Sequence, residues 1–201
     1  MSEISRLWRT ARKLRRGRRG RKTLPLLLFF TDPTRTPDPA AVAARLPRGA
    51  GVVVRAFGAR DARETGRILA RVCRRRGLAL LVGADPRLAA RLGADGLHLP
   101  ERLAPKAQRF RGRFLVTAAA HSLPAALRAR RAGADALVVS PVFPSRSPSA
   151  GRPLGPRALA QLARRAKTPV YALGGVNADN ARKLAATGVV GVAAIDALAA
   201  S

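Results

Sequence analysis

Short apolar runs recur from residue 24 to the end of the chain, and segments with helical spacing separate them. The runs lack strict alternation of apolar and polar positions, which is typical of parallel strands covered on both faces. Strands are predicted near 24–31, 50–56, 78–83, 95–99, 113–120, 135–140, 168–173 and 188–194. The clearest helices are predicted over 61–76, 122–132, 155–167 and 177–187.

The junctions that lead from a helix into the next strand reuse one pattern, in which a glycine is followed by small residues and by Asp or Gly. It occurs at Gly49-Ala50-Gly51, Gly93-Ala94-Asp95, Gly133-Ala134-Asp135 and Gly188-Val189-Val190-Gly191. Glycine readily adopts the left-handed conformation that ends a helix. Eight units of this kind predict a short α/β fold, a (β/α)8 TIM barrel over residues 23–201, with a doubly wound open sheet as the alternative.

Residues 1–22 form a separate, basic N-terminal extension with ten Lys or Arg residues and one acid. Its apolar residues Ile4, Leu7, Trp8, Ala11 and Leu14 recur at helical spacing, which indicates a short amphipathic helix before the run RRGRRGRK. The composition favours a solvated, partly disordered tail. Docking of this segment on an anionic membrane surface or on nucleic acid is the alternative.

The net charge of +28 changes this picture little. Most of the positive residues are arginines, and no aromatic residues interleave with them in the barrel region. Stacking platforms for bases are therefore missing, and nucleic-acid binding is not favoured as the main function. The single cysteine, Cys73, lies on the apolar face of a predicted helix and allows no intrachain disulfide, so a cytoplasmic location is expected. Assembly into a homo-oligomer stays open.

Candidate chemistry is expected on the loops at the carboxyl ends of the strands. Gly174-Gly175 follows the seventh predicted strand, and a glycine pair there lets backbone N–H groups approach an anion. Ile195 and Asp196 follow the eighth strand, so the two loops together predict a phosphate site. The carboxylate of Asp196 would repel a phosphate unless it points away.

Other loops supply further candidates. His121, after the fifth strand, lies where a barrel holds a general acid or base. Arg55, after the second strand, suits a phosphate or a carboxylate. The loop 141–155 is expected to act as a lid that brings Ser145 and Ser147 to the ligand. No carboxylates are paired at metal-ligand spacing in one loop, so neither a metal nor another cofactor is expected.

Several of these motifs carry a resemblance. GADGLHLP at 93–100, His-Ser at 121–122, GADALVVSPVFPS at 133–145, PVYALGGVNADN at 169–180 and GVAAI at 191–195 resemble the thiamine phosphate synthase and thiazole tautomerase (TenI-like) family. The resemblance covers about residues 24–198. It implies a barrel that binds a thiazole phosphate in thiamine biosynthesis.

The resemblance also shows where this chain departs from the family. The synthase branch joins a pyrimidine pyrophosphate to the thiazole phosphate and holds magnesium on two aspartates. Arg55 keeps the arginine of strand 2. The departures are Phe57 for a lysine, Gly83-Ala84 for an Asn-Asp pair, Leu103 for the second aspartate, Ala119 for a serine, Pro148 for a lysine and Asp196 for a serine.

Because both magnesium ligands are replaced, the resemblance points to the tautomerase branch. Its reaction is a metal-independent proton transfer that aromatises a thiazole carboxylate phosphate, and His121 would supply the acid or base. Thiamine phosphate synthase activity is one alternative. A non-catalytic protein that binds thiazole phosphate or thiamine phosphate is the other.

Overall fold

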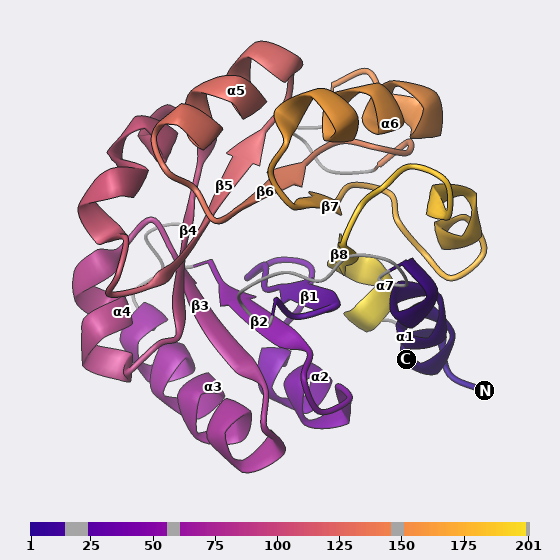
Figure 1. Cartoon of the computed structure of the whole chain (residues 1–201). Helices are drawn as coiled ribbons and strands as arrows, with labels where there is room; N and C mark the ends of the chain where they lie inside the picture. Colours follow the sequence, from indigo (N-terminus) through magenta and orange to yellow (C-terminus); the bar gives the residue numbers. More distant parts are fainter. Residues whose placement is uncertain (15–23, 56–60, 146–150, 200–201) are drawn as a thin grey trace.

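A computed structural model describes residues 1–14, 24–55, 61–145 and 151–199. Eight parallel strands close into a barrel in sequence order, and the last strand pairs with the first (Figure 1). The strands are β1 Leu27–Phe30, β2 Gly51–Val54, β3 Ala79–Gly83, β4 Gly96–Leu99, β5 Leu115–Ala120, β6 Ala136–Val139, β7 Val170–Ala172 and β8 Gly191–Ala194. The predicted (β/α)8 barrel is confirmed, and the open sheet is excluded.

Helical segments connect the strands on the outside of the barrel. They are α2 Pro39–Arg45, α3 Ala62–Arg76, α4 Pro86–Leu92, α5 Leu123–Arg131 and α6 Gly155–Ala166, with the 3-10 helices η1 Glu101–Phe110 and η2 Ala181–Leu184. The helix predicted over 177–187 is wrong, because only η2 forms there. The side chain of Asn177 accepts hydrogen bonds from the N–H groups of Asp179 and Asn180, and such local bonds compete with helix formation.

The recurring Gly-Ala-Asp junction ends a helix and links two neighbouring strands of the barrel. Gly93 ends α4 at a φ of 62°, and the carboxylate of Asp95 accepts a hydrogen bond of 2.8 Å from the N–H of Leu80. The carboxylate of Asp135 accepts an equivalent bond of 2.8 Å from Val116. Each aspartate therefore ties the strand that it precedes to the neighbouring strand.

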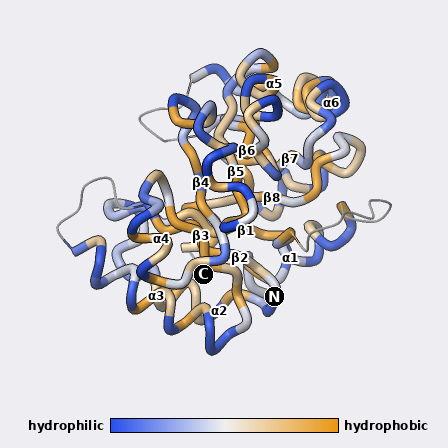
Figure 2. Tube along the Cα trace, turned by 60° about the vertical axis from the view of Figure 1, so that its left-hand side comes forward, coloured by the Kyte–Doolittle hydropathy of each residue, from blue (hydrophilic) through white to orange (hydrophobic). Residues whose placement is uncertain are grey.

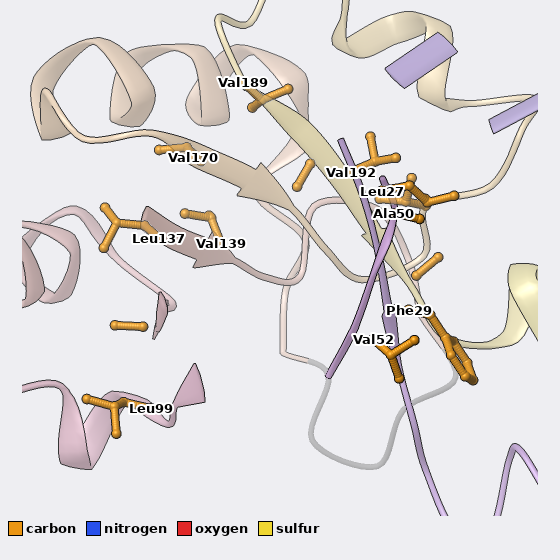
Figure 3. Packing of buried hydrophobic residues seen from close by; sticks show 14 of the residues in the cluster. Leu27, Phe29, Ala50, Val52, Leu99, Leu137, Val139, Val170, Val189 and Val192 are labelled. Carbon is orange, nitrogen blue, oxygen red and sulfur yellow. The ribbon is translucent and has the colours of Figure 1, made fainter. Parts of the chain in front are cut away.

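Successive residues of each strand point alternately into and out of the barrel. The inner set includes Leu28, Phe30 and Tyr171, whose hydroxyl donates to the carbonyl of Pro25 at 2.6 Å. The outer set packs between strands and helices, as Figure 3 shows for Leu27, Phe29 and Val52 among others. In Figure 2, apolar stretches run along the strands, and many polar residues lie along the surrounding helices.

Cys73 lies in the outer layer of the core with 2% of its surface exposed, as predicted. Burial raises the pKa of its thiol to about 12, so the sulfur stays protonated and acts as a small apolar group. Within the described ranges, no helix combines the length and apolarity needed to cross a bilayer.

The N-terminal segment is part of the barrel. Helix α1, Glu3–Leu14, packs against β8, β1, η2 and α7, and it buries Ile4, Leu7 and Ala11. Helix α7, Asp196–Ala199, follows β8 and has only four residues, so α1 lies beside it where a full eighth helix would cover the barrel (Figure 1). The interpretation of residues 1–22 as a solvated, partly disordered tail is therefore wrong for 3–14; residues 15–22 lie outside the described ranges.

Candidate functional site

A cavity of about 880 Å³ opens at the carboxyl ends of the strands. It brings together seven of the predicted site residues: Arg55, His121, Ser145, Gly174, Gly175, Ile195 and Asp196. The predicted Ser147 lies outside the described residues, as do Phe57 and Pro148. The cavity also has residues in its wall that the sequence did not single out as site residues, among them Glu3, Arg35 and Glu101.

The glycine pair joins two loops at the cavity wall. Gly174 and Gly175 have φ angles of 89° and 64°, which favour glycine. A Cβ on Gly175 would lie 2.2 Å from the carbonyl oxygen of Pro144, and one on Gly174 would lie 2.8 Å from Cα of Pro141. The N–H of Phe143 also donates to the carbonyl of Gly174 at 2.9 Å. The pair thus has to be glycine because the loop after β6 packs against it, a reason that the ligand-based prediction missed.

The turn that follows the pair is held by its own side chains. The amide of Asn180 donates to the carbonyl of Gly175 at 2.7 Å and accepts from the N–H of Asn177 at 3.0 Å. By contrast, the N–H groups of Gly174, Gly175 and Val176 have no acceptor among the described residues. All three residues line the cavity, so this loop presents backbone donors on a fixed frame.

Asp196 is turned toward a chain of ion pairs. Its carboxylate lies 3.4 Å from Arg35, whose guanidinium also donates to Asp32 at 3.0 Å. Arg55 reaches the same Asp32 oxygen at 3.2 Å. Burial alone would raise the pKa of Asp32, but hydrogen bonds from Thr34 and Arg35 outweigh it and lower the pKa to about 2. Arg35 thus offsets the negative charge of Asp196 next to the cavity.

Arg55 is fixed in the wall of the cavity. Its Nε donates to the carbonyl of Thr31 at 2.8 Å, and its guanidinium carbon lies 5.6 Å from the centre of the Phe30 ring. Burial lowers the pKa of Arg55 to about 10, with Asp32 opposing that shift, so the side chain remains a cation at neutral pH. A fixed guanidinium at this place can bind an anionic group of a ligand.

His121 extends from the end of β5 toward the end of β6. Its Nδ1 lies 2.7 Å from the carbonyl oxygen of Ser140, and because a carbonyl can only accept, Nδ1 carries a proton. The N–H of His121 donates to Glu101 at 2.9 Å, which anchors the backbone of the residue. In the neutral ring, Nε2 then holds the lone pair, so the arrangement suits an oriented acid or base.

His98 differs from His121 in being buried, with 7% of its surface exposed. Its Nδ1 lies 2.9 Å from the hydroxyl of Thr117, and its ring meets the Phe30 ring edge-to-face at 4.9 Å. Burial, helped by the nearby charge of Arg55, lowers the pKa of His98 to about 3. The ring is therefore neutral and contributes a positioned polar group to the cavity wall.

Among the described residues, the side chains of the cavity wall do not form a magnesium site. The carboxylates in the cavity wall are Glu3, Glu101 and Asp196, and each is bound to a different donor: the N–H of Ala178, the N–H of His121 and Arg35. No three metal-ligating side chains cluster in the part of the chain that the structure describes. Ala84 lines the cavity where the resemblance expects a magnesium aspartate.

Comparisons with known proteins agree on one family. The model of the family described as thiamine monophosphate synthase matches residues 27–198. A thiamine-phosphate synthase of Pyrococcus furiosus is 32% identical over 177 residues, which cover 86% of each chain. The corresponding protein of Alcanivorax borkumensis is 36% identical over 86% of this chain and 84% of its own.

A solved structure agrees with the sequence relatives. The structure described as thiamine phosphate pyrophosphorylase from Pyrococcus furiosus has a TM-score of 0.71 and 28% identity, and the match covers 86% of this chain and 87% of that one. The names of these relatives favour the synthase reaction, which was the alternative interpretation of the sequence, over the tautomerase.

Proposed function

The chain belongs to the thiamine monophosphate synthase family, and from this membership we propose that its cavity binds a thiazole phosphate of thiamine biosynthesis. The observation that carries this proposal is the set of three backbone N–H groups at Gly174, Gly175 and Val176 in the cavity wall. Backbone N–H groups of a turn commonly bind a phosphate, and in TIM barrels a phosphate site frequently lies in the loops after strands 7 and 8.

Synthesis of thiamine phosphate is the first reaction we propose, because relatives that match over most of their length carry that name. The reaction joins a pyrimidine pyrophosphate to the thiazole phosphate, and the pyrophosphate leaves with its negative charge. Arg35, Arg55 and Arg102 line the cavity and would stabilise that charge directly. We therefore expect turnover to depend on these arginines.

Thiazole tautomerisation is the second candidate, and the geometry of His121 favours it. The hydrogen bond to the carbonyl of Ser140 fixes the tautomer, so that Nε2 of the neutral ring can take a proton. An oriented base of this kind typically contributes about 10²–10⁴-fold to a proton transfer. This reaction also needs none of the carboxylates that are replaced at Ala84 and Leu103.

One NMR experiment on a single preparation separates the candidates. The protein is incubated with thiazole phosphate and pyrimidine pyrophosphate, and separately with the thiazole carboxylate phosphate tautomer, with and without magnesium. Appearance of thiamine phosphate supports the first reaction. Conversion of the tautomer that falls about 10²-fold or more in His121→Ala supports the second. Arg130→Ala, an exposed change on α5, is the control and should match the wild type.

The same samples also test the binding proposal itself. If neither reaction occurs but thiazole phosphate binds tightly, the protein is a non-catalytic binding protein. Absence of both turnover and binding would contradict the proposal and leave only the family and the fold.

A further inference from the structure

We propose that Glu3 of helix α1 is a positioning residue for the loop after β7, so that the N-terminal helix is part of the ligand site. Glu3 lines the cavity, and its Oε1 accepts a hydrogen bond of 2.6 Å from the N–H of Ala178. Its side chain is only 23% exposed. The contact joins the first residue of α1 to a residue 175 positions away in the loop after β7.

The loop itself explains why an outside acceptor is needed. Side chains within it satisfy the backbone N–H groups of Asn177, Asp179 and Asn180. These side chains provide no acceptor for the N–H of Ala178, and the carboxylate of Glu3 accepts that hydrogen bond. Through Glu3, every backbone donor from 177 to 180 is held, which fixes the loop two residues beyond Val176 and its open donors.

A second contact and the buried face of α1 keep Glu3 in place. Arg6, one helical turn along, forms an ion pair with Asp179 in the same loop. Ile4, Leu7 and Ala11 are buried against the barrel. Because α7 has only four residues, α1 provides the outer wall at this corner, and its first turn is brought to the cavity by that packing.

The charge of Glu3 distinguishes a positioning role from a merely electrostatic one. A carboxylate near a phosphate seat repels the ligand, and this repulsion is eased by the Ala178 N–H and by Arg6 at 3.7 Å. Glutamine at position 3 keeps an oxygen acceptor for Ala178 and removes the charge. Alanine removes both. If the hydrogen bond is what matters, alanine at position 3 should disturb the loop, whereas glutamine should leave it close to wild type.

The test compares wild type, Glu3→Ala and Glu3→Gln, with Glu64→Ala as the matched control. Glu64 is exposed in the first turn of α3, so its replacement changes the net charge equally, away from the cavity. Hydrogen exchange of the Ala178 amide and the Kd for thiazole phosphate are measured. In Glu3→Ala, exchange should accelerate about 10-fold or more and the Kd should rise about 3–10-fold, as expected for the loss of a part-buried hydrogen bond. Glu3→Gln and Glu64→Ala should stay within about twofold of wild type.

Two results would overturn the proposal. The first is an Ala178 amide that exchanges at the wild-type rate in Glu3→Ala. The second is binding of thiazole phosphate that becomes tighter by the same factor in Glu3→Ala and Glu3→Gln, because the carboxylate would then act only by repelling the ligand. The affinity measurement rests on the proposed function, whereas the exchange measurement does not. If wild type fails to bind thiazole phosphate, the proposed function fails, and exchange at Ala178 alone decides the role of Glu3.

Discussion

The cavity has two halves that differ in what makes them. The half for which we propose phosphate binding, called the phosphate half, is built by the loops after β7 and β8 and contains the backbone N–H groups of Gly174, Gly175 and Val176. The arginine half consists of residues at the carboxyl ends of β2, β3 and β4 and presents side chains, among them Arg55 and the neutral His98. The resemblance places the replaced magnesium ligands in the arginine half. A site made of backbone persists as long as the loop folds, whereas a site made of side chains changes with single substitutions.

One turn in the arginine half has a backbone conformation that is uncommon for the residue it holds. Ala84 has a φ of 61°, a left-handed conformation that is uncommon for alanine and several-fold enriched in Asn and Asp. Its N–H donates to the carbonyl of His98 at 2.8 Å, which holds the turn. The turn therefore has the shape that suits the Asn-Asp pair of the family, although this chain has Gly83-Ala84.

The largest expected effect is a loss of stability at acidic pH, and its source is His98 in the arginine half. The pKa of His98 is about 3 in the folded protein and about 6.5 when exposed, so below pH 6.5 the unfolded chain takes up a proton that the folded protein does not. The free energy of unfolding should then fall by up to about 1.4 kcal/mol for each pH unit between 6.5 and 3. Urea unfolding at pH 7, 5.5 and 4.5 measures this slope. All three pH values lie above the range in which Asp32 titrates, since its pKa is about 2 in the folded protein.

His98→Asn is the control for this effect, because asparagine can still reach Thr117 but does not titrate. The variant should show a shallower decline between pH 6.5 and 4.5, whatever its stability at pH 7. An unchanged slope would mean that His98 is not the group responsible and that it is accessible to protons in the folded state.

A substitution in the phosphate half comes next in size. Gly175→Ala places a Cβ within 2.2 Å of the Pro144 carbonyl, so the loop after β6 must move. We expect a loss of about 2–3 kcal/mol in the free energy of unfolding and at least about 10-fold weaker binding of thiazole phosphate. Chemical denaturation and calorimetric titration measure the two quantities.

Gly93→Ala separates steric contact from backbone strain. Gly93 has a φ of 62°, and there is open space where a Cβ would lie. The variant should therefore lose about 1 kcal/mol in the free energy of unfolding from backbone strain alone, and its binding of thiazole phosphate should be unchanged. If the two glycine variants lose equal stability and bind equally well, the packing of the two loops has no part in the phosphate site.

The smallest effect should come from relieving the turn at Ala84. Ala84→Gly removes the cost of a left-handed alanine, which exceeds the extra flexibility of glycine in the unfolded chain, so the protein should gain about 0.5 kcal/mol. Ala90→Gly, inside α4, should instead lose about 1 kcal/mol. Denaturant unfolding of both variants checks the signs. Destabilisation in Ala84→Gly would show that this turn is unstrained.

The strand pattern, the junction glycines and the order of loops were enough to predict the barrel, because apolar runs and left-handed glycines are local signals. The docking of α1 was not predictable from Ile4, Leu7 and Ala11 alone, since a free amphipathic helix has the same spacing. It depends on the short α7, which leaves the barrel uncovered at that place. Likewise, the pairing of Arg35 with Asp196 joins residues 161 positions apart, and no local pattern announces it.

We propose that a thiazole phosphate binds with its phosphate at the backbone donors of the phosphate half. The most direct test follows the backbone amide resonances of ¹⁵N-labelled protein during titration with thiazole phosphate. The largest shifts should fall on Gly174, Gly175 and Val176, with smaller ones at Ile195. Shifts confined to Arg55, Ala84 and His98, with the glycine pair unmoved, would contradict the claim and place the ligand in the arginine half.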